Sequence, residues 1–283
     1  MRLPAGERVG VQAPLGRRLV HVVERREHGA YVVLAAADPD GPVPLPGQVY
    51  MLTAAARWGG GDGERPLLPR AFSVLRTSGA SRPVLEFMLE AVGPGTERLC
   101  ELGEGDGLHL LGPLGLGFTA PGEGRRALLC GGGVGTAPLA ILQDVLLVDG
   151  VPSTALLGFR DAAHAAGAEL LTDAVVATDD GCVGRAGLVT ELLAGELDGG
   201  GDAEVYACGP PAMLEAVRAL CEARGVPAQL ALESGMACGY GACFGCVVPV
   251  RGGGYVRLCV DGPVLDGSRL DSCLTADPVP TRR

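Results

Sequence analysis

Four cysteines near the end of the chain have the residue type and the spacing to bind a metal cluster. Cys238, Cys243 and Cys246 lie in ESGMACGYGACFGC, and Cys259 follows in YVRLCVDGPV. The spacing C-x4-C-x2-C with a remote fourth cysteine is the plant-type arrangement for a [2Fe–2S] cluster, whereas zinc sites usually have two separated C-x2-C pairs. The glycines between them would let a loop wrap the cluster and turn N–H groups toward the sulfurs. The sequence predicts a [2Fe–2S] site, with a structural zinc site as the alternative.

Two glycine-rich turns follow apolar runs and precede helical patterns, which suits them to bind phosphates. One is GGGVGTAP, residues 131–138, and the other is CGP, residues 208–210. Glycines let the backbone approach a ligand, and ligands of open α/β sheets bind at the carboxyl ends of strands. The first turn is not G-x-G-x-x-G, and either turn alone is compatible with a tight connection that binds nothing. Two such turns together favour a nucleotide site.

Two further segments, RAFS (70–73) and GPGT (93–96), contain weaker phosphate-binding signals. An arginine can bind phosphate through two parallel hydrogen bonds, and a Gly-Thr turn offers N–H and hydroxyl donors. Both patterns are common, so neither indicates a site without further support.

The elements that must position these residues fall into three stretches. Residues 16–118 contain short β-type runs separated by turn residues, which predicts an antiparallel barrel or sandwich. Residues 125–228 alternate strands with helices, as in a doubly wound parallel sheet, and QLALES is expected to close that sheet. We therefore expect a β plus α/β protein with domains at 1–122, 123–228 and 229–283, the last being the small cluster domain.

Composition excludes several classes of function. The net charge is −10 and basic residues form only short pairs, so no nucleic-acid surface is expected. The N-terminal stretch lacks a long apolar run and the longest apolar stretch is broken by glycines and Asp144, so neither a secretory signal nor a membrane span is expected. Ten cysteines without a signal indicate a reducing compartment, and we expect a cytoplasmic protein.

Taken together, RAFS, GPGT, GPLGLGF, GGGVGTAP, ACGPPAM and LESGMACGYGACFGC with its distant cysteine resemble the electron-transfer subunits of class 1B dihydroorotate dehydrogenases, a branch of the ferredoxin–NADP reductase family. The resemblance covers nearly the whole chain. The gap of twelve residues before the last cysteine favours this branch over oxygenase reductases, in which that gap is much longer.

The resemblance implies roles position by position. FAD would bind at Arg70, Ala71, Phe72, Ser73, Met88, Leu89, Glu90, Gly95 and Thr96. The nicotinamide nucleotide would bind at Gly132, Gly133, Val134, Gly135, Thr136, Cys208, Gly209 and Pro210. The cluster ligands would be Cys238, Cys243, Cys246 and Cys259.

The resemblance also implies partners and a direction of electron flow. Dihydroorotate would be oxidised on FMN in a separate catalytic subunit, in a heterotetramer of two plus two chains. Electrons would pass through the [2Fe–2S] cluster to FAD and then, as hydride, to NAD⁺. Consistent with that division, the sequence contains no recognisable orotate site, catalytic triad or pair of catalytic carboxylates.

Three departures from the family pattern bear on FAD. Ala71 replaces a proline, and Glu90 and Pro94 stand where basic residues are common. We expect these changes to weaken FAD retention. Arg160 and Asp161, at the end of the second strand of the α/β region, leave NAD and NADP both open, and NAD is chosen on the resemblance alone.

Two rival interpretations remain at this level. Related subunits serve ferredoxin, sulfide or polysulfide, and hydrogenase partners, and the motifs do not separate these. A non-redox zinc adaptor on a degenerate reductase fold is the more distant rival, supported by the same departures at Ala71, Glu90 and Pro94.

Overall fold

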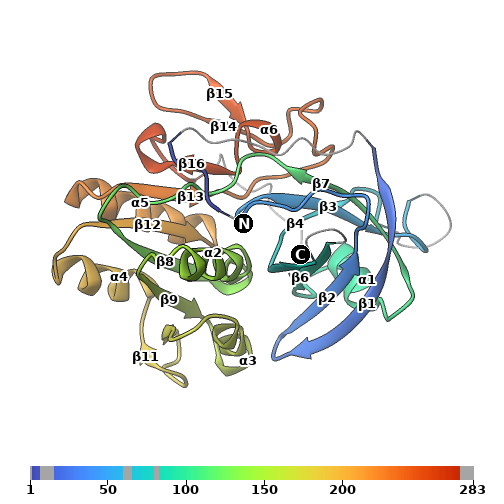
Figure 1. The fold of residues 1–283 in the computed structure, drawn as a ribbon, viewed down its shortest axis with the longest axis horizontal. Coiled ribbons are helices and arrows are strands. Elements are labelled where there is room, and N and C mark those ends of the chain that lie inside the picture. Colours follow the sequence, from blue (N-terminus) through green and yellow to red (C-terminus); the bar gives the residue numbers. More distant parts are fainter. Residues whose placement is uncertain (1, 7–15, 60–65, 80–82, 275–283) are drawn as a thin grey trace.

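The computed structural model describes residues 2–6, 16–59, 66–79 and 83–274. One half of the molecule is an antiparallel sheet with the strand order β4-β3-β7-β1-β2-β6-β5 (Figure 1). Its elements are β1 (Arg18–His28), β2 (Tyr31–Ala37), β3 (Val49–Ala54), β4 (Arg70–Ser73), β5 (Arg76–Ser78), β6 (Val84–Leu89), α1 (Pro94–Cys100) and β7 (Gly107–Leu114). The expected antiparallel flavin-type barrel is thus confirmed as an antiparallel half-barrel.

The strands of this half-barrel form because apolar residues recur at alternate positions or in short continuous runs. In β1 the buried residues Val20 and Val22 alternate with exposed neighbours, as in a strand with one solvated face. Strand β3, by contrast, is buried along its whole length between β4 and β7. Aliphatic side chains supply most of this core, to which Tyr50 and Phe87 add an edge-to-face ring pair at 5.6 Å.

The other half is a second seven-stranded sheet with the order β11-β10-β9-β8-β12-β13-β16. Its strands are parallel except β16. The elements are β8 (Arg126–Gly132), η1 (Gly133–Gly135), α2 (Thr136–Val148), β9 (Ser153–Phe159), α3 (Ala162–Ala165), η2 (Ala166–Leu170), β10 (Val175–Thr178), β11 (Arg185–Ala186), α4 (Val189–Asp198), β12 (Ala203–Cys208), α5 (Pro211–Arg224) and β13 (Ala228–Ala231). The expected alternation of strands and helices is confirmed.

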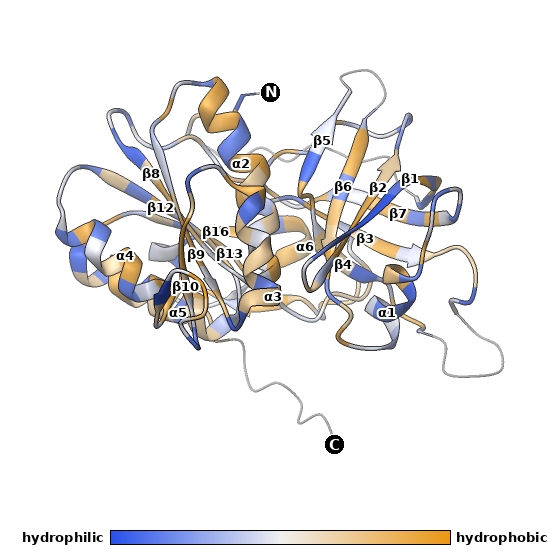
Figure 2. Cartoon of the chain, turned by 90° about the horizontal axis from the view of Figure 1, so that it is seen from below, coloured by the Kyte–Doolittle hydropathy of each residue, from blue (hydrophilic) through white to orange (hydrophobic). Residues whose placement is uncertain are grey.

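Helix α2 lies between the parallel sheet and the half-barrel (Figure 2). It is apolar on nearly all sides, as a helix must be when both flanks are covered. Leu139 and Leu142 pack with sheet residues such as Leu129, whereas Ile141 packs into the core of the half-barrel. The helix therefore contributes apolar side chains to the cores of both halves.

The C-terminal segment contains β14 (Val247–Pro249), β15 (Tyr255–Arg257), α6 (Leu258–Asp261), β16 (Val264–Asp266) and η3 (Gly267–Arg269). The expectation that QLALES closes the parallel sheet is wrong. Strand β13 within it has a further neighbour, β16, which comes after the cysteines and pairs antiparallel through Ala231 and Val264. A three-residue strand with no periodicity of its own gives no signal in the sequence.

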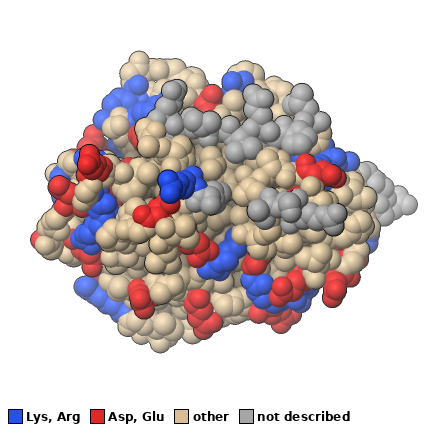
Figure 3. Space-filling view, in the orientation of Figure 1, with Lys and Arg blue, Asp and Glu red and all other residues tan. Residues whose placement is uncertain are grey.

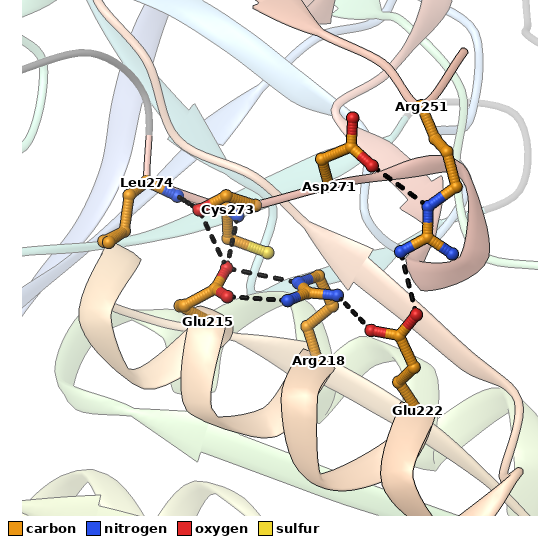
Figure 4. A network of polar contacts seen from close by, with 8 residues as sticks. Glu215, Arg218, Glu222, Arg251, Asp271, Cys273 and Leu274 are labelled. Atoms are coloured by element: carbon orange, nitrogen blue, oxygen red, sulfur yellow. Dashed lines mark hydrogen bonds and ion pairs between the residues drawn. The ribbon is translucent and has the colours of Figure 1, made fainter.

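An ion-pair network holds this segment against α5 (Figure 4). Glu215 accepts hydrogen bonds from Arg218 (2.7 Å) and from the backbone N–H of Cys273 (2.6 Å). Arg218 also pairs with Glu222, which in turn pairs with Arg251 of the C-terminal segment. Arg251 and the Cys273 N–H thus connect the C-terminal segment to the carboxylates of α5, which Arg218 holds from within the helix.

Charges of opposite sign are interspersed on the face drawn in Figure 3, in keeping with the many arginine–carboxylate pairs. Across the described ranges, no helix has the length and apolar character needed to cross a membrane.

Candidate functional site

The two glycine-rich turns lie side by side at the carboxyl ends of adjacent parallel strands. Cys208 of β12 is in register with Gly131 of β8. A Cβ at Gly135 would collide with the carbonyl oxygen of Cys208, so the two turns approach backbone to backbone. The sheet thereby brings together two segments that are more than seventy positions apart in the sequence.

A cavity of about 590 Å³ opens where the half-barrel, these turns and the C-terminal segment meet; we call it the junction cavity. It brings together segments predicted to bind FAD and segments predicted to bind the nucleotide. The expected site residues in its wall are Arg70, Ala71, Phe72, Ser73, Met88, Val134 and Cys208. The sequence reasoning missed the stretch 231–237 and Pro263, which line the same cavity. The only available signal was that 231–237 come directly before Cys238 and that Pro263 follows Cys259 by four positions.

Arg70 reaches the turn that contains Gly95, as the paired RAFS and GPGT signals require. Its guanidinium packs directly against Gly95, lies 5.9 Å from the ring centroid of Trp58, and donates to the carbonyl of Leu68 at 2.7 Å. Thr96 uses its hydroxyl within the turn, accepting from the Val92 N–H (2.9 Å) and donating to the Gly93 carbonyl. Arg70, on β4, therefore places a positive charge beside this turn, where it can face a phosphate.

A second cavity, of about 540 Å³, lies over the carboxyl ends of the parallel strands; we call it the strand-end cavity. The expected residues in its wall are Glu90, Gly132, Gly133, Val134, Gly209 and Pro210. Val134 and Glu233 line both cavities, so the two are contiguous. The remaining expected residues, Leu89, Gly95, Thr96, Gly135 and Thr136, line neither, and Leu89 and Thr136 are fully buried.

Glu90 stands at the centre of a charged network that crosses between the two halves of the molecule. Its Oε1 accepts from Arg160 Nη2 at 2.8 Å and lies 3.1 Å from Nε2 of the buried His164. The other ring nitrogen of His164, Nδ1, is 2.6 Å from Asp161 Oδ1. The hydrogen bonds from His164 and the charge of Arg160 lower the pKa of Asp161. Sequence reasoning did not find this network, because Glu90 is seventy positions from its partners.

Further hydrogen bonds cross the boundary between the half-barrel and the α/β half. The N–H of Ala30, in the β1–β2 turn, donates to the carbonyl of Ala163 in α3 at 2.9 Å. Arg76 of β5 pairs with Asp144 of α2 at 3.0 Å and donates to the carbonyl of Leu170 at 2.6 Å. These bonds tie the half-barrel to α2, α3 and η2 of the other half.

Glu233 borders both cavities. Its side chain is exposed to their open space, yet protein atoms crowd the carboxyl group, and the resulting desolvation raises its pKa.

The four expected cluster cysteines fall into a buried pair and a more exposed pair. The sulfurs of Cys246 and Cys259 are buried and 3.3 Å apart, and burial together with its Cys246 neighbour raises the pKa of Cys259 to about 12. Cys238 is half-buried and Cys243 exposed. Burial opposes ionisation of Cys238, but backbone N–H groups of Cys243, Tyr240 and Ala242 outweigh it and lower its pKa to about 6.

These residues fit a [2Fe–2S] cluster in donor type, order and surroundings. Four cysteine thiols are the usual ligand set, and backbone N–H groups already point at one of the sulfurs. Within the described parts of the chain, no three Cys, His, Asp or Glu side chains are already gathered as a metal cage. The arrangement is thus an assembled pair, Cys246 and Cys259, with two further thiols on a glycine-rich loop.

The cysteine loop begins at the wall of the junction cavity. Ala237 lines that cavity, and the next residue is Cys238. Gly239, with φ of +81°, presses against the half-barrel, and a Cβ there would lie 2.6 Å from Met51 Cγ. The loop is therefore seated between β3 and the cavity.

Two solved structures that share this fold are a ferredoxin-linked oxidoreductase and a ferredoxin reductase. An NADH-dependent reduced ferredoxin–NADP oxidoreductase matches with a TM-score of 0.76 and 25% identity, covering 92% of each chain. The ferredoxin reductase of carbazole 1,9a-dioxygenase matches with a TM-score of 0.64 and 24% identity, over 75% of this chain and 66% of that one. The fold is that of the ferredoxin–NADP reductase class.

Sequence comparisons then give the family. Residues 233–271 match the model for the iron-sulfur cluster binding domain of dihydroorotate dehydrogenase B. The dihydroorotate dehydrogenase B (NAD(+)) electron transfer subunit of Caldanaerobacter subterraneus is 38% identical over 86% of this chain and 94% of its own length. That of Geobacillus thermodenitrificans is 36% identical over 88% and 96%. The chain belongs to the family of dihydroorotate dehydrogenase B electron transfer subunits, and the resemblance expected from its motifs is confirmed.

Proposed function

We propose that this chain transfers electrons between a dihydroorotate-oxidising catalytic subunit and NAD⁺, using a [2Fe–2S] cluster and FAD. The observation that carries the proposal is the continuity of three sites. The cysteine loop starts at Ala237 in the wall of the junction cavity, and that cavity shares Val134 and Glu233 with the strand-end cavity. A nicotinamide exchanges hydride and a cluster exchanges single electrons, whereas a flavin can do both, so a flavin placed between the cluster and the nicotinamide links the two half-reactions.

The chain's own residues would position these groups. We assign the junction cavity to the flavin, with Arg70 at its phosphates and Phe72, Ser73 and Met88 along its ring. The strand-end cavity would hold the nicotinamide nucleotide on the Gly132–Gly133 and Gly209–Pro210 turns. Cys238, Cys243, Cys246 and Cys259 would hold the cluster. In this scheme Val134 and Glu233, which border both cavities, lie where flavin and nucleotide would meet.

The proposed domain limits follow from these assignments: 1–122 for FAD, 123–228 for the nucleotide and 229–283 for the cluster. Strands β13 and β16 connect the last two, since both belong to the parallel sheet. We further propose that the catalytic subunit contains FMN and that the complex has two copies of each chain.

An anaerobic visible spectrum with iron, sulfide and zinc assays on the same sample tests the cofactors. We expect about two irons per chain and flavin absorption. A colourless, zinc-loaded protein would contradict the proposal. Addition of NADH should bleach the flavin, whereas dihydroorotate should do so only when the catalytic subunit is present. Reduction of the isolated chain by dihydroorotate would contradict the division of labour.

Ferredoxin is the partner to test second, because the solved structure with a TM-score of 0.76 is a ferredoxin-linked oxidoreductase. Rapid electron exchange with reduced ferredoxin, and none with the dihydroorotate-oxidising subunit, would favour that alternative.

A further inference from the structure

We propose that Glu90 makes the strand-end cavity select NAD(H) over NADP(H) by holding Arg160 away from a 2′-phosphate. The inference rests on the proposed function, because it states how the proposed nucleotide site chooses its ligand. Glu90 was expected along the flavin together with Met88 and Leu89, but it lines this cavity and not the junction cavity.

Arg160 stands where a 2′-phosphate would be recognised. In doubly wound domains the end of the second strand carries either an acid for the ribose hydroxyls or an arginine for the 2′-phosphate. Arg160 directly follows β9, the second strand of the proposed nucleotide domain. It is the one arginine among the described residues that line the cavity, and the whole sequence contains no lysine.

The guanidinium of Arg160 is already paired. Glu90 Oε1 accepts from it at 2.8 Å, and Asp161 Oδ2 lies 3.6 Å from its Nε. The Arg160 side chain is 62% exposed, so burial does not keep a phosphate away from it. The carboxylates of Glu90 and Asp161 keep a phosphate away instead. They neutralise the charge of Arg160 and place negative charge where the phosphate would bind.

Glu90 cannot easily swing aside. It follows β6 of the half-barrel, its side chain is only 18% exposed, and the same Oε1 faces the buried His164. His164 is in turn held by Asp161. The carboxylate that neutralises Arg160 is thus fixed from the opposite half of the molecule.

The rest of the cavity has the same electrostatic character. Asp179, after β10, adds a further carboxylate to the lining, whereas Arg160 is already neutralised. Such a lining tolerates ribose hydroxyls, which donate hydrogen bonds to carboxylates. It disfavours a phosphate monoester, which adds about −1.5 to −2 charge.

Binding of 5′-ADP and of 2′,5′-ADP, measured by calorimetry on the cofactor-loaded protein, tests the inference without turnover. Wild type should prefer 5′-ADP. In Glu90→Gln the preference should shift toward 2′,5′-ADP by about tenfold, as expected for one freed charge-assisted contact. The ratio of kcat/KM for NADPH to that for NADH should rise by a similar factor. Addition of Arg160→Ala to Glu90→Gln should abolish the gain.

Glu86→Gln is the matched control, since Glu86 lies on β6 and pairs with Arg26 outside the cavity. It should leave the ligand preference unchanged. An unchanged preference in folded Glu90→Gln would overturn the inference while leaving the proposed function intact. Failure of wild type to bind 5′-ADP would instead overturn the proposed nucleotide site itself.

Arg160→Ala alone gives an independent test that does not require Glu90→Gln to fold. If Glu90 already withholds Arg160, the single Arg160→Ala change should not lower the relative affinity for 2′,5′-ADP. A drop of about tenfold would mean that Arg160 already binds the phosphate, and would overturn the inference.

Discussion

The strand-end turns and the cysteine loop are both rich in glycine, but their conformations are fixed by different means. The turns follow β8 and β12, whose parallel pairing sets the positions of Gly131 and Cys208. Residues 232–246, by contrast, contain no helix or strand, and the loop is anchored by the buried Cys246–Cys259 pair and by contact with the half-barrel.

The nucleotide site is therefore preorganised by the sheet, whereas the cluster site is completed only when the cluster binds. Sheet hydrogen bonds hold the turns in place whether or not a nucleotide is bound. Cys238 and Cys243 lie on an irregular loop, so part of the free energy of cluster binding must order that loop. The nucleotide and cluster sites should therefore respond differently to substitution and to loss of ligand.

Loss of a buried cysteine ligand should have the largest effect. Cys246→Ser should reduce bound iron from about two per chain to nearly none, because the buried sulfur pair is the assembled part of the site. Iron and sulfide assays measure this loss. The control is Cys182→Ser, because Cys182 is exposed and is not one of the four expected cluster ligands. Retention of full iron in Cys246→Ser would show that the cluster ligands are assigned wrongly.

Gly135→Ala should damage the preorganised site through its backbone. The new Cβ would meet the carbonyl of Cys208, which cannot move without disturbing the sheet, and we expect destabilisation of about 1–3 kcal/mol with weakened NADH binding. Urea unfolding and NADH titration measure both. In Gly195→Ala, within α4, the Cβ would meet open space, so stability should stay equal or rise. Equal stability of the two variants would contradict the close approach of the turns.

Arg70→Ala should weaken FAD binding while leaving iron content unchanged. Removal of a charge-assisted contact is expected to raise the Kd for FAD about ten- to a hundredfold. Arg70→Lys should recover only part of the loss, because lysine lacks the planar fork of donors. Flavin retention on gel filtration, followed by fluorescence titration, measures the effect. Full FAD retention in Arg70→Ala would place the flavin phosphates elsewhere.

Glu215→Gln should have a smaller effect that depends on pH. Arg218, chiefly, and the Cys273 N–H lower the pKa of Glu215 below its ordinary value of 4.5. Its ionised form therefore stabilises the fold above that ordinary value, and the stabilisation is lost as pH falls through the lowered pKa. We expect a loss of about 1–2 kcal/mol at pH 7 that shrinks below pH 4.

Urea unfolding at both pH values measures the effect of Glu215→Gln. The exposed Glu191, paired with Arg185 at 3.5 Å, provides the control variant Glu191→Gln, which should change little at either pH. A loss in Glu215→Gln that does not vary with pH would mean that the charge of Glu215 does not contribute.

Local sequence patterns predicted much of this architecture. Alternation of apolar residues indicated β1, and the glycine turns indicated the ends of β8 and β12, since these signals depend on near neighbours in the chain. The Glu90–Arg160 pair and the junction cavity join segments far apart in sequence, so no local pattern reveals them. The strand β16 has only three residues, and its pairing with β13 and the burial of Val264 and Leu265 depend on segments elsewhere in the chain, which is why it was missed.

The position of β16 has a consequence for the modularity of the molecule. Ala231 and Val264 face each other on adjacent antiparallel strands, and the Leu232 N–H continues the ladder to the Pro263 carbonyl at 2.9 Å. Residues 233–262 therefore leave and re-enter the sheet at nearly the same point. Topologically, residues 233–262 are an insertion between the two strands of a β-hairpin, β13 and β16. A short turn could replace this insertion without changing the order of the strands. Gain or loss of such an insertion would convert a two-cofactor reductase into a three-cofactor one while the sheet stays the same.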